Sequence, residues 1–415
     1  MSFEYIRSKR GQQMILLNNF KFRFAYKAIQ TGNIRWRCFV KECKGTIHVN
    51  ELDEIIDQTE HTCNGPCSDP IIMRQKLAGA CKRKAVDDIC QRPQKIILGE
   101  IQTLSNNNFT TTDVSCIRQT IYRTRRQFFP TNPESISELH TIIDHTEILT
   151  TRGEQFLLHN DHEKNIIIFS CDTNLKFLCN SKSIYVDGTF QYCPKHFVQL
   201  FTIHGYINNY YVPLVFCLLK NKFIETYKES FEVIKYKCTE KKLLLYPENI
   251  TVDFEVSIHK AALIVWPLIT IIGCRFHLTQ SWYRKLQELG LSNAYKTCEW
   301  LKVTFGLTFL NPEDVSDCFV DDFMTLIPEG TAFIQYADYL IDNYISEESK
   351  YPPKIWALMD PSLARTTNNC ESFHSHFNDQ FYKAHPSINI FLKILIENVH
   401  IIITLKYIVL ITQSQ

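Results

Sequence analysis

Three acidic residues stand in the sequence where a metal site for phosphate chemistry needs them. Asp187 ends a short run of β-branched and aromatic residues, and Asp253 ends a second such run. These runs predict core strands, and acids at the carboxyl ends of neighbouring strands can meet at one edge of a sheet. Glu371 follows a polar cluster at 365–369, which predicts a helix start with Thr or Asn as its cap. Because hard cations prefer carboxylate oxygens, these acids are the candidate ligands of two catalytic cations, Mg²⁺ or Mn²⁺.

Two residues near these acids have competing interpretations. Glu255, two positions after Asp253, is interpreted as the opening residue of the next helix, where the positive end of the helix dipole favours an acid. His374 lies three positions after Glu371 on the same helical face. It either reaches the metal and the scissile phosphate or is a partly buried histidine.

Cys274 and His277 form another candidate pair. Their spacing of three positions is typical of half of a metal site. No matching second pair is evident nearby in the sequence. A structural or substrate-positioning role is therefore at least as good an interpretation as a zinc site.

Soft metal ligands gather near the amino terminus. Cys38 and Cys43 are five positions apart, and His61 and Cys63 are two apart after a turn-like stretch. Three thiols and one imidazole have the number and type of ligands of a closed structural zinc site. The alternating pattern of residues 20–24 predicts a half-buried strand, so we expect this site in a small β module. The competing interpretation is a small β domain with incidental buried thiols.

Around the three acids the chain resembles a known family. Residues 183–378 resemble the Mutator-like (MULE) transposase domain, a ribonuclease-H-like nuclease of the DDE type. The matching blocks, in the family's order, are IYVDGTFQ, FVQLFTIHGYINNYYVPLVFCLLKNK, VDFE, GCRFHLTQ and NNCESFH. The resemblance implies that the strands ending in Asp187 and Asp253 lie side by side. It also implies a helical insertion before Glu371, and cutting and joining of DNA.

The amino-terminal module resembles a FLYWCH-type zinc finger. The residues in the positions that name this family are Tyr5, Leu16 or Leu17, Phe22 or Phe24, Trp36, Cys38, Cys43 and His61. The chain departs from the family in a shorter gap between the cysteines and in Cys63, which stands where a second histidine is expected. Cys67 is an alternative ligand, and His48 is a weaker one.

Charge is distributed unevenly along the 415 residues. Residues 1–130 contain 21 Lys and Arg against 12 Asp and Glu, a net charge of +9, and the remaining 24 basic and 32 acidic residues give −8. A basic front part favours contact with a polyanion, and an unevenly charged solvated surface is the alternative. The first residues lack an apolar segment, so we expect no export signal. The 16 cysteines are accordingly interpreted as reduced thiols and metal ligands.

The predicted fold class is α/β: a ribonuclease-H-like mixed sheet with a helical insertion, preceded by a small β-rich zinc finger. The expected domains are a FLYWCH-type zinc finger at 1–67, a linker at 68–94, a basic helical region at 95–160, a MULE catalytic domain at 161–388 with a helical insertion at about 278–360, and an apolar carboxyl-terminal helix at 389–415. Charged residues interrupt the last segment every few positions, so we expect a buried or amphipathic helix there and no membrane span.

Two basic clusters precede the predicted catalytic domain. The cluster at 82–84 is either a nuclear import signal or plain surface. The arginines that recur along a predicted helix of the basic region are Arg118, Arg123, Arg125 and Arg126. This helix either contacts DNA phosphates, which adds affinity without sequence readout, or exposes its arginines for solubility.

The sequence therefore predicts a nuclear DNA transposase, or a domesticated derivative, that binds double-stranded DNA and uses structural Zn²⁺ and catalytic Mg²⁺ or Mn²⁺. A homo-oligomer is left open. The alternative is a non-catalytic DNA-binding or transcriptional regulatory protein that keeps the transposase-derived scaffold. Retention of all three acids argues against this alternative, because folding alone does not require acids clustered at strand ends.

Overall fold

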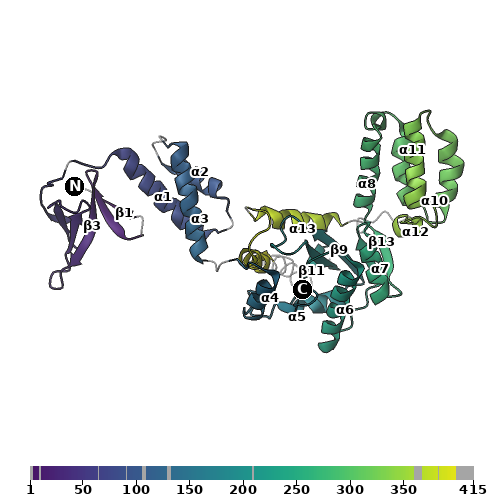
Figure 1. Cartoon of the computed structure of the whole chain (residues 1–415), viewed down its shortest axis with the longest axis horizontal. Helices are drawn as coiled ribbons and strands as arrows, with labels where there is room; N and C mark the ends of the chain where they lie inside the picture. Colours follow the sequence, from purple (N-terminus) through teal and green to yellow (C-terminus); the bar gives the residue numbers. More distant parts are fainter. Residues whose placement is uncertain are drawn as a thin grey trace, which may run out of the picture. The chain divides into compact units, whose positions relative to one another are not determined.

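The computed structural model describes residues 3–8, 11–63, 65–89, 91–104, 109–128, 132–207, 210–358, 367–381 and 383–398. The chain divides into two compact units, residues 1–131 and residues 132–415. Each unit has its own sheet and is described by itself (Figure 1).

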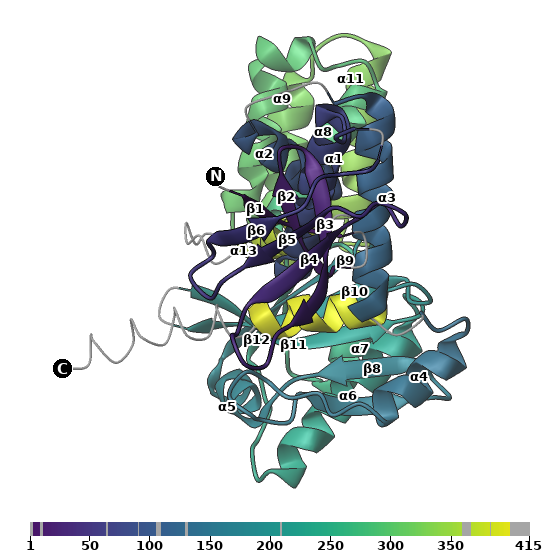
Figure 2. The ribbon, with the colours of Figure 1, turned by 90° about the vertical axis from the view of Figure 1, so that its left-hand side faces the viewer.

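The first unit opens with a six-stranded antiparallel sheet in which every strand pairs with its neighbour in the sequence (Figure 2). Its strands are β1 (Glu4–Arg7), β2 (Gln13–Leu17), β3 (Phe20–Lys27), β4 (Ile34–Cys38), β5 (Thr46–Val49) and β6 (Ile55–Gln58). Phe22 and Trp36 are buried in an apolar cluster on one face of the sheet. Met14 and Leu16 lie in a second cluster, which includes a side chain of the helix that follows. The predicted small β-rich module is confirmed.

Three helices complete the first unit: α1 (Asp69–Asp87), α2 (Pro93–Thr103) and α3 (Thr111–Phe128). Helix α1 occupies most of the segment that was interpreted as a linker. Pro70 stands in its first turn, where a missing N–H costs little. Leu77, Cys81 and Ala85 recur at helical spacing and are buried against α2 and α3. Because this apolar stripe is covered, the segment is part of the unit's core, which corrects the linker interpretation.

Arg125 of α3 is a structural residue. Its guanidinium group is buried and donates to the backbone oxygens of Ala85, Asp88 and Gln91 at 3.3, 2.8 and 2.7 Å. A cation at the carboxyl end of a helix satisfies carbonyl groups that have no partner within the helix. Arg125 therefore closes the end of α1 and does not belong to an exposed arginine surface, whereas Arg123 is exposed.

The second unit is built on a seven-stranded mixed sheet with the order β13-β12-β9-β10-β11-β8-β7. Its strands are β7 (Leu157–Asp161), β8 (Ile166–Phe169), β9 (Ser183–Thr189), β10 (Gln199–Ile207), β11 (Tyr210–Leu219), β12 (Asn249–Val252) and β13 (Thr270–Gly273). Strand β12 runs parallel to both of its neighbours, β9 and β13, and the other pairs are antiparallel. The predicted mixed, ribonuclease-H-like α/β fold is confirmed.

Helices cover both faces of this sheet (Figures 1 and 2). They are α4 (Ile136–Asp144), α5 (Asp172–Asn180), α6 (Ile224–Glu240), α7 (Val256–Val265) and α13 (Asn368–Asp379). Ile184 and Val186 of β9 belong to the main core, which α5, α6 and α7 enclose. Tyr185 packs instead on Cys370 of α13. Since side chains alternate along a strand, Asp187 shares the face that α13 covers.

Between β13 and α13 the chain forms a helical bundle with its own core. Its α-helices are α8 (Arg275–Glu288), α9 (Glu299–Thr304), α10 (Asp314–Asp317), α11 (Thr331–Leu340) and α12 (Pro353–Trp356). Trp282, Trp356 and Tyr336 are among its fully buried side chains. Helix α8 starts at the edge strand β13 and continues into the bundle, so it connects the sheet to the bundle (Figure 1).

The chain is helical again at residues 388–398, where Ile394 and Leu395 are buried. The part of the predicted apolar helix beyond residue 398 lies outside the described residues. Among the residues that the structure describes, no helix has the length and apolar character of a membrane span.

Arg125→Gln is expected to lower the free energy of unfolding of the first unit by about 2–4 kcal/mol, because buried carbonyl groups at the end of α1 lose a charged donor. Denaturant titration of the full chain, followed by hydrogen exchange of the α1 and α3 amides, measures this loss. Arg123→Gln is the matched control, since this neighbour is exposed, and it is expected to change stability by less than about 0.5 kcal/mol. Equal effects of the two substitutions would contradict the assignment.

Candidate functional site

The pairing of two parallel strands places the first two acids side by side. Thr251 of β12 pairs with Tyr185 of β9, and the acids follow two positions later, Asp187 within β9 and Asp253 as the first residue after β12. Parallel strands with the same register present such residues at the same edge and on the same face. The side chain of Asp187 is 11% exposed and that of Asp253 is 48% exposed, so the pair has one buried and one accessible carboxylate.

The third acid reaches this edge from α13. The helix begins after Thr367, as the polar cluster predicted, and Glu371 lies in its first turn. Thr367 does not cap the helix with its side chain. Its backbone N and Oγ1 both donate instead to the Sγ of Cys274, each at 3.2 Å. Because Cys370, His374 and Phe377 are buried at helical spacing, one face of α13 is held on the unit and the position of Glu371 is set.

His277 of α8 stands between two of the acids. Its Nε2 lies 2.7 Å from Oε1 of Glu371, and its Nδ1 lies 3.5 Å from Oδ1 of Asp253. Burial alone would lower the pKa of His277, but its contacts with Cys274, Glu371 and Asp253 raise that pKa to about 11. The positive charge of this imidazolium thus lies between two carboxylates that would otherwise repel each other.

Cys274 and His277 lie within the acidic site, and in the described part of the chain they belong to no gathered group of three or more metal-ligand atoms. Cys274 is the first residue after β13. The residue before it, Gly273, lies against the ring of Phe254, and a Cβ added to Gly273 would lie 2.5 Å from that ring. Burial would raise the pKa of the Cys274 thiol, and its contacts with His277 and Thr367 lower it overall. The pair links the start of α8 to the start of α13, which is a positioning role.

Asp187 lies on a buried polar network. Burial raises the pKa of its carboxyl group to about 7, with the nearby charges of Glu371 and Asp253 adding to the effect. The Nε2 of His374 lies 3.5 Å from Oδ2 of Asp187 and 2.9 Å from Oγ1 of Thr202. Burial lowers the pKa of His374 to about 3, so this histidine is neutral. His374 is thus both buried and in contact with the site, which joins the two interpretations that the sequence left open.

Thr202 and His204 were not identified from the sequence. Thr202 pairs directly with Asp187 across β10 and β9, and its Oγ1 is 2.8 Å from Nε2 of His204. Both side chains are fully buried. The sequence pattern that could have identified them is a pair of polar residues at alternating positions within the apolar run of β10. Such residues share one face of the strand, and buried polar groups need a hydrogen-bond partner there.

Glu255 is separate from these acids. It is the N-cap position of α7, which confirms the helix start that was predicted there. Its carboxylate accepts hydrogen bonds from the hydroxyl of Tyr227 and from Nζ of Lys222, each at 2.8 Å. Both oxygens of Glu255 thus have hydrogen-bond partners outside the three acids.

The carboxylates of Asp187, Asp253 and Glu371 offer the oxygen ligands that hard cations prefer. Their oxygens are not gathered into a preformed cluster in the described structure, because His277 stands between Asp253 and Glu371. The half-exposed Asp253 leaves the edge open to solvent. The arrangement is that of an acidic edge held by histidines from two helices.

The amino-terminal ligands are gathered in the way a tetrahedral metal requires. Within the described residues, the group of His, Cys, Asp and Glu side chains whose ligand atoms all lie within 4.8 Å of one another is Cys38, Cys43, His61 and Cys63. The Sγ atoms of Cys38 and Cys63 are 4.0 Å apart, and Nδ1 of His61 lies 3.4 Å from Sγ of Cys43. Zn–S bonds of about 2.3 Å at tetrahedral angles place ligand sulfurs roughly 3.8 Å apart. The cluster fits structural zinc.

The surroundings of this cluster stabilise a thiolate and orient the imidazole. Burial would raise the pKa of Cys43, but backbone donors from Gly45 and Thr62 lower it to about 5. His61 stacks on Phe20 with ring centroids 3.7 Å apart. A Cβ at position 45 would lie 2.7 Å from Nδ1 of His61, so this position requires glycine.

The alternative ligands are placed elsewhere. His48 faces Asp57, with Nδ1 and Oδ2 3.9 Å apart. Cys67 packs beside the apolar cluster of Met14, Leu16 and Ile72. Neither belongs to the four-ligand group, so Cys63 takes the fourth position as the sequence predicted.

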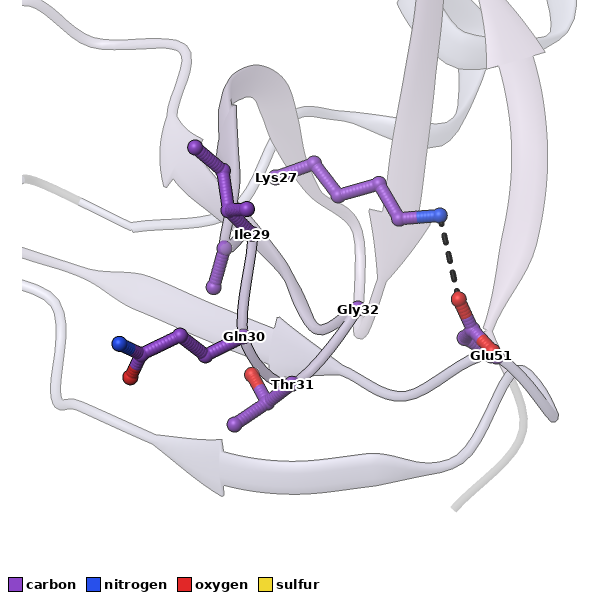
Figure 3. Close-up of a pocket in the computed structure, with 7 residues that line it drawn as sticks. Lys27, Ile29, Gln30, Thr31, Gly32 and Glu51 are labelled. Carbon is purple, nitrogen blue, oxygen red and sulfur yellow. Dashed lines mark hydrogen bonds and ion pairs between the residues drawn. The ribbon is translucent and has the colours of Figure 1, made fainter.

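A shallow depression lies at the tip of the hairpin formed by β3 and β4 (Figure 3). Its lining residues are Lys27, Ala28, Ile29, Gln30, Thr31, Gly32 and Glu51. Nζ of Lys27 binds Oε1 of Glu51 at 3.2 Å, which joins the tip to the neighbouring turn. The depression brings no group of catalytic or metal-binding side chains together.

Comparison with known families agrees with both centres. The model of the MULE transposase domain matches residues 183–281, and the model of the FLYWCH zinc finger domain matches residues 5–63. The first match includes Asp187, Asp253 and His277, and the second includes all four ligands of the amino-terminal cluster. No curated protein sequence matches the chain.

Metal analysis of the full chain is expected to find about one zinc per chain, and Cys63→Ser is expected to lose most of it, because one of four ligands of a closed site is replaced. Cys67→Ser is the matched control, since this thiol lies outside the four-ligand group. A native chain that folds without zinc, or equal zinc loss in the two variants, would refute this site.

Cys274→Ala is expected to leave the zinc content unchanged and to accelerate hydrogen exchange of the amides at 367–371, because the acceptor for the start of α13 is removed. Cys298→Ala, a partly buried thiol of the helical bundle, serves as the control and should leave these amides unaffected. Loss of a second zinc in Cys274→Ala would show that the pair is a metal site after all.

Proposed function

Because the chain contains a MULE transposase domain behind an amino-terminal FLYWCH zinc finger domain, we propose that it is a DNA transposase, or a domesticated derivative. In this proposal the finger unit binds double-stranded DNA and the second unit cuts and joins phosphodiester bonds. The observation that carries it is the meeting of three acids from β9, β12 and α13 at one sheet edge.

Asp187, Asp253 and Glu371 are the residues that would hold two Mg²⁺ or Mn²⁺ ions. Such ions, when bound, supply positive charge for the attacking and leaving oxygens of the phosphate. Carboxylates suit this role because they bind hard cations and leave coordination positions for phosphate oxygens. Asp253 is the most accessible of the three, with 48% of its side chain exposed against 32% for Glu371, so the phosphate would approach from its side.

The other residues of the site hold the acids in place. Thr202 donates a hydrogen bond to the backbone oxygen of Asp187 and is itself bonded to His374 of α13, whose ring lies against the Asp187 carboxylate. His277 holds Glu371 and balances negative charge in the absence of other cations. Cys274 and Thr367 tie the starts of α8 and α13 together, so that Glu371 keeps its place.

The partners follow from charge and family. A basic amino-terminal part suits duplex DNA, and a homo-oligomer would bring two DNA ends together. Nuclear localisation is part of the proposal, with the basic cluster at 82–84 as its candidate signal. In the structure this cluster lies on α1, and Lys84 pairs with Glu100.

A specific observation also supports the alternative function, a non-catalytic DNA-binding or transcriptional regulatory protein on a transposase-derived scaffold. His277 occupies the space between Asp253 and Glu371 and lies within ion-pair distance of both carboxylates. A cationic side chain between these two acids offsets part of the charge that metal ions would otherwise balance. The two functions differ in whether the full chain cuts DNA.

Asp187→Asn, Asp253→Asn and Glu371→Gln are each expected to reduce Mn²⁺-dependent nicking of labelled duplex DNA by at least about 10³-fold, nearly as much as the triple variant. Residues that act as one unit show such non-additive losses. Each change keeps the side-chain volume, and unchanged zinc content and circular dichroism would verify the fold.

Glu255→Gln is the matched control for this series. It lies two positions from Asp253, but its carboxylate is held by Tyr227 and Lys222, so nicking is expected to stay within a few fold of native. If Glu255→Gln abolished nicking while Asp253→Asn did not, the second acid would be misassigned. If the native chain nicked no DNA with Mg²⁺ or Mn²⁺, the scaffold function would replace the enzyme.

A further inference from the structure

One face of the finger sheet carries a group of arginines on adjacent strands. Arg23 of β3 pairs directly with Arg37 of β4, and Arg35 stands two positions before Arg37 on the same strand. Residues that pair across strands, or that lie two apart along one, share a face. We call this group, together with Tyr26, the arginine face.

A bulge brings Tyr26 into the arginine face. The register between β3 and β4 shifts between Phe24 and Tyr26, so that Tyr26 pairs with Arg35 while Phe24 pairs with Trp36. Without the extra residue, Tyr26 would continue the alternation of Phe22 and Phe24 on the opposite face. Bulges re-aim side chains in this way. The guanidinium carbon of Arg35 lies 6.0 Å from the centre of the Tyr26 ring.

Acidic side chains do little to balance the positive charge of the arginine face. Among the residues that the structure describes, no ion pair to Arg23, Arg35 or Arg37 occurs. The strand acids on this face are engaged elsewhere: Glu4 of β1 pairs with Lys76, and Asp57 of the edge strand β6 faces His48. The guanidinium of Arg37 reaches only the backbone oxygen of Lys41, at 3.5 Å. Arg23 and Arg37 are exposed.

The other cations of the same strand are neutralised or tied down. Lys21 is buried and donates to Oε1 of Gln75 on α1, at 2.7 Å. Lys27 binds Glu51 at the hairpin tip (Figure 3). Folding therefore engages these two lysines and leaves the arginines unpaired. Like charges placed directly opposite each other destabilise a sheet, so the Arg23–Arg37 pair opposes folding.

We propose that the arginine face binds the phosphate backbone of double-stranded DNA. The proposal rests on the proposed function, and it assigns the DNA contact of the first unit to this face, with Arg23, Arg35 and Arg37 on phosphates. A bound polyanion would offset the repulsion between these arginines. Binding a polyanion therefore explains why the arginines lie together, which the contacts within the folded chain do not.

The chemistry of the face favours duplex DNA over other anionic partners. Single strands are bound by several aromatic side chains on which successive bases stack, whereas Tyr26 is the aromatic residue among these arginines. Phe24 and Trp36, two further aromatic residues of these strands, pair with each other on the opposite face.

The test measures binding of the zinc-loaded full chain to a mixed-sequence duplex of 30 base pairs, roughly three helical turns, by fluorescence anisotropy at several salt concentrations without Mg²⁺ or Mn²⁺. The test variant replaces all three arginines, as Arg23→Gln, Arg35→Gln and Arg37→Gln. Its slope of the logarithm of the association constant against the logarithm of the salt concentration is expected to fall in magnitude by about 2.7, or about 0.9 for each lost phosphate contact. At 0.1 M salt this corresponds to about eightfold weaker binding per contact.

Three variants control for fold and for charge alone. Lys27→Gln removes a cation that is already paired with Glu51, so slope and affinity are expected to stay near native. The triple Arg→Lys variant should keep most of the slope, since a point charge suffices for phosphate contact. Arg23→Gln alone should keep its zinc and melt no lower than native, because it removes a repulsion. A structural arginine would instead destabilise the finger.

The proposal is overturned if the triple Gln variant, with its zinc retained, binds duplex DNA with native affinity and slope. It is also overturned if the native chain binds a single strand of equal length more tightly than the duplex. Nicking with Mn²⁺ is scored separately. A native chain that nicks DNA while the triple Gln variant binds as native would end this inference and leave the transposase function standing.

Discussion

Parallel pairing of β12 with β9 is the constraint on which the second unit depends. The shared register places Asp253 and Asp187 at equivalent positions two residues beyond the pair of Thr251 and Tyr185. The next strand, β13, ends at Gly273 beside Val252, so α8 starts at the same edge and delivers His277 to it. A shift of β12 by one residue would turn Asp253 to the opposite face, away from α13 and Glu371.

Burial of negative charge is the second constraint. Neutral and cationic side chains from other helices and strands lie against the buried acids and offset its cost. Desolvation raises the pKa of Asp187, which accepts a backbone hydrogen bond from Gly188 and lies against the neutral His374. Glu371 and Asp253 share the imidazolium of His277. These contacts link the sheet, α8 and α13, so the site and the helical bundle that α8 enters are mechanically connected.

The first unit combines a small sheet with a metal-ligand cluster and a helical cover. Six short strands bury few side chains, so the cluster of three thiols and one imidazole and the packing of α1 on Met14 and Leu16 supply stability that the sheet alone lacks. Arg125 secures the other end of α1. Positive charge is used in two ways here: buried Arg125 holds the fold, and the exposed arginines of the β3–β4 hairpin face solvent.

The sequence by itself determined the types of residue at the two centres, since strands that lead to Asp187 and Asp253, a helix start at Thr367 and the spacing of four zinc ligands are local patterns of period, turn and cap. The predicted strand end at Asp187 is wrong, because β9 continues to Thr189 and Asp187 lies within the strand. It also determined the mixed α/β class. Only the tertiary structure decided that Thr202 opposes Asp187, that Cys274 binds Thr367 and that a bulge turns Tyr26 toward Arg35. It also placed a helix in the expected linker and buried Arg125. These features depend on register and on contacts between residues far apart in the chain, which local periodicity does not encode.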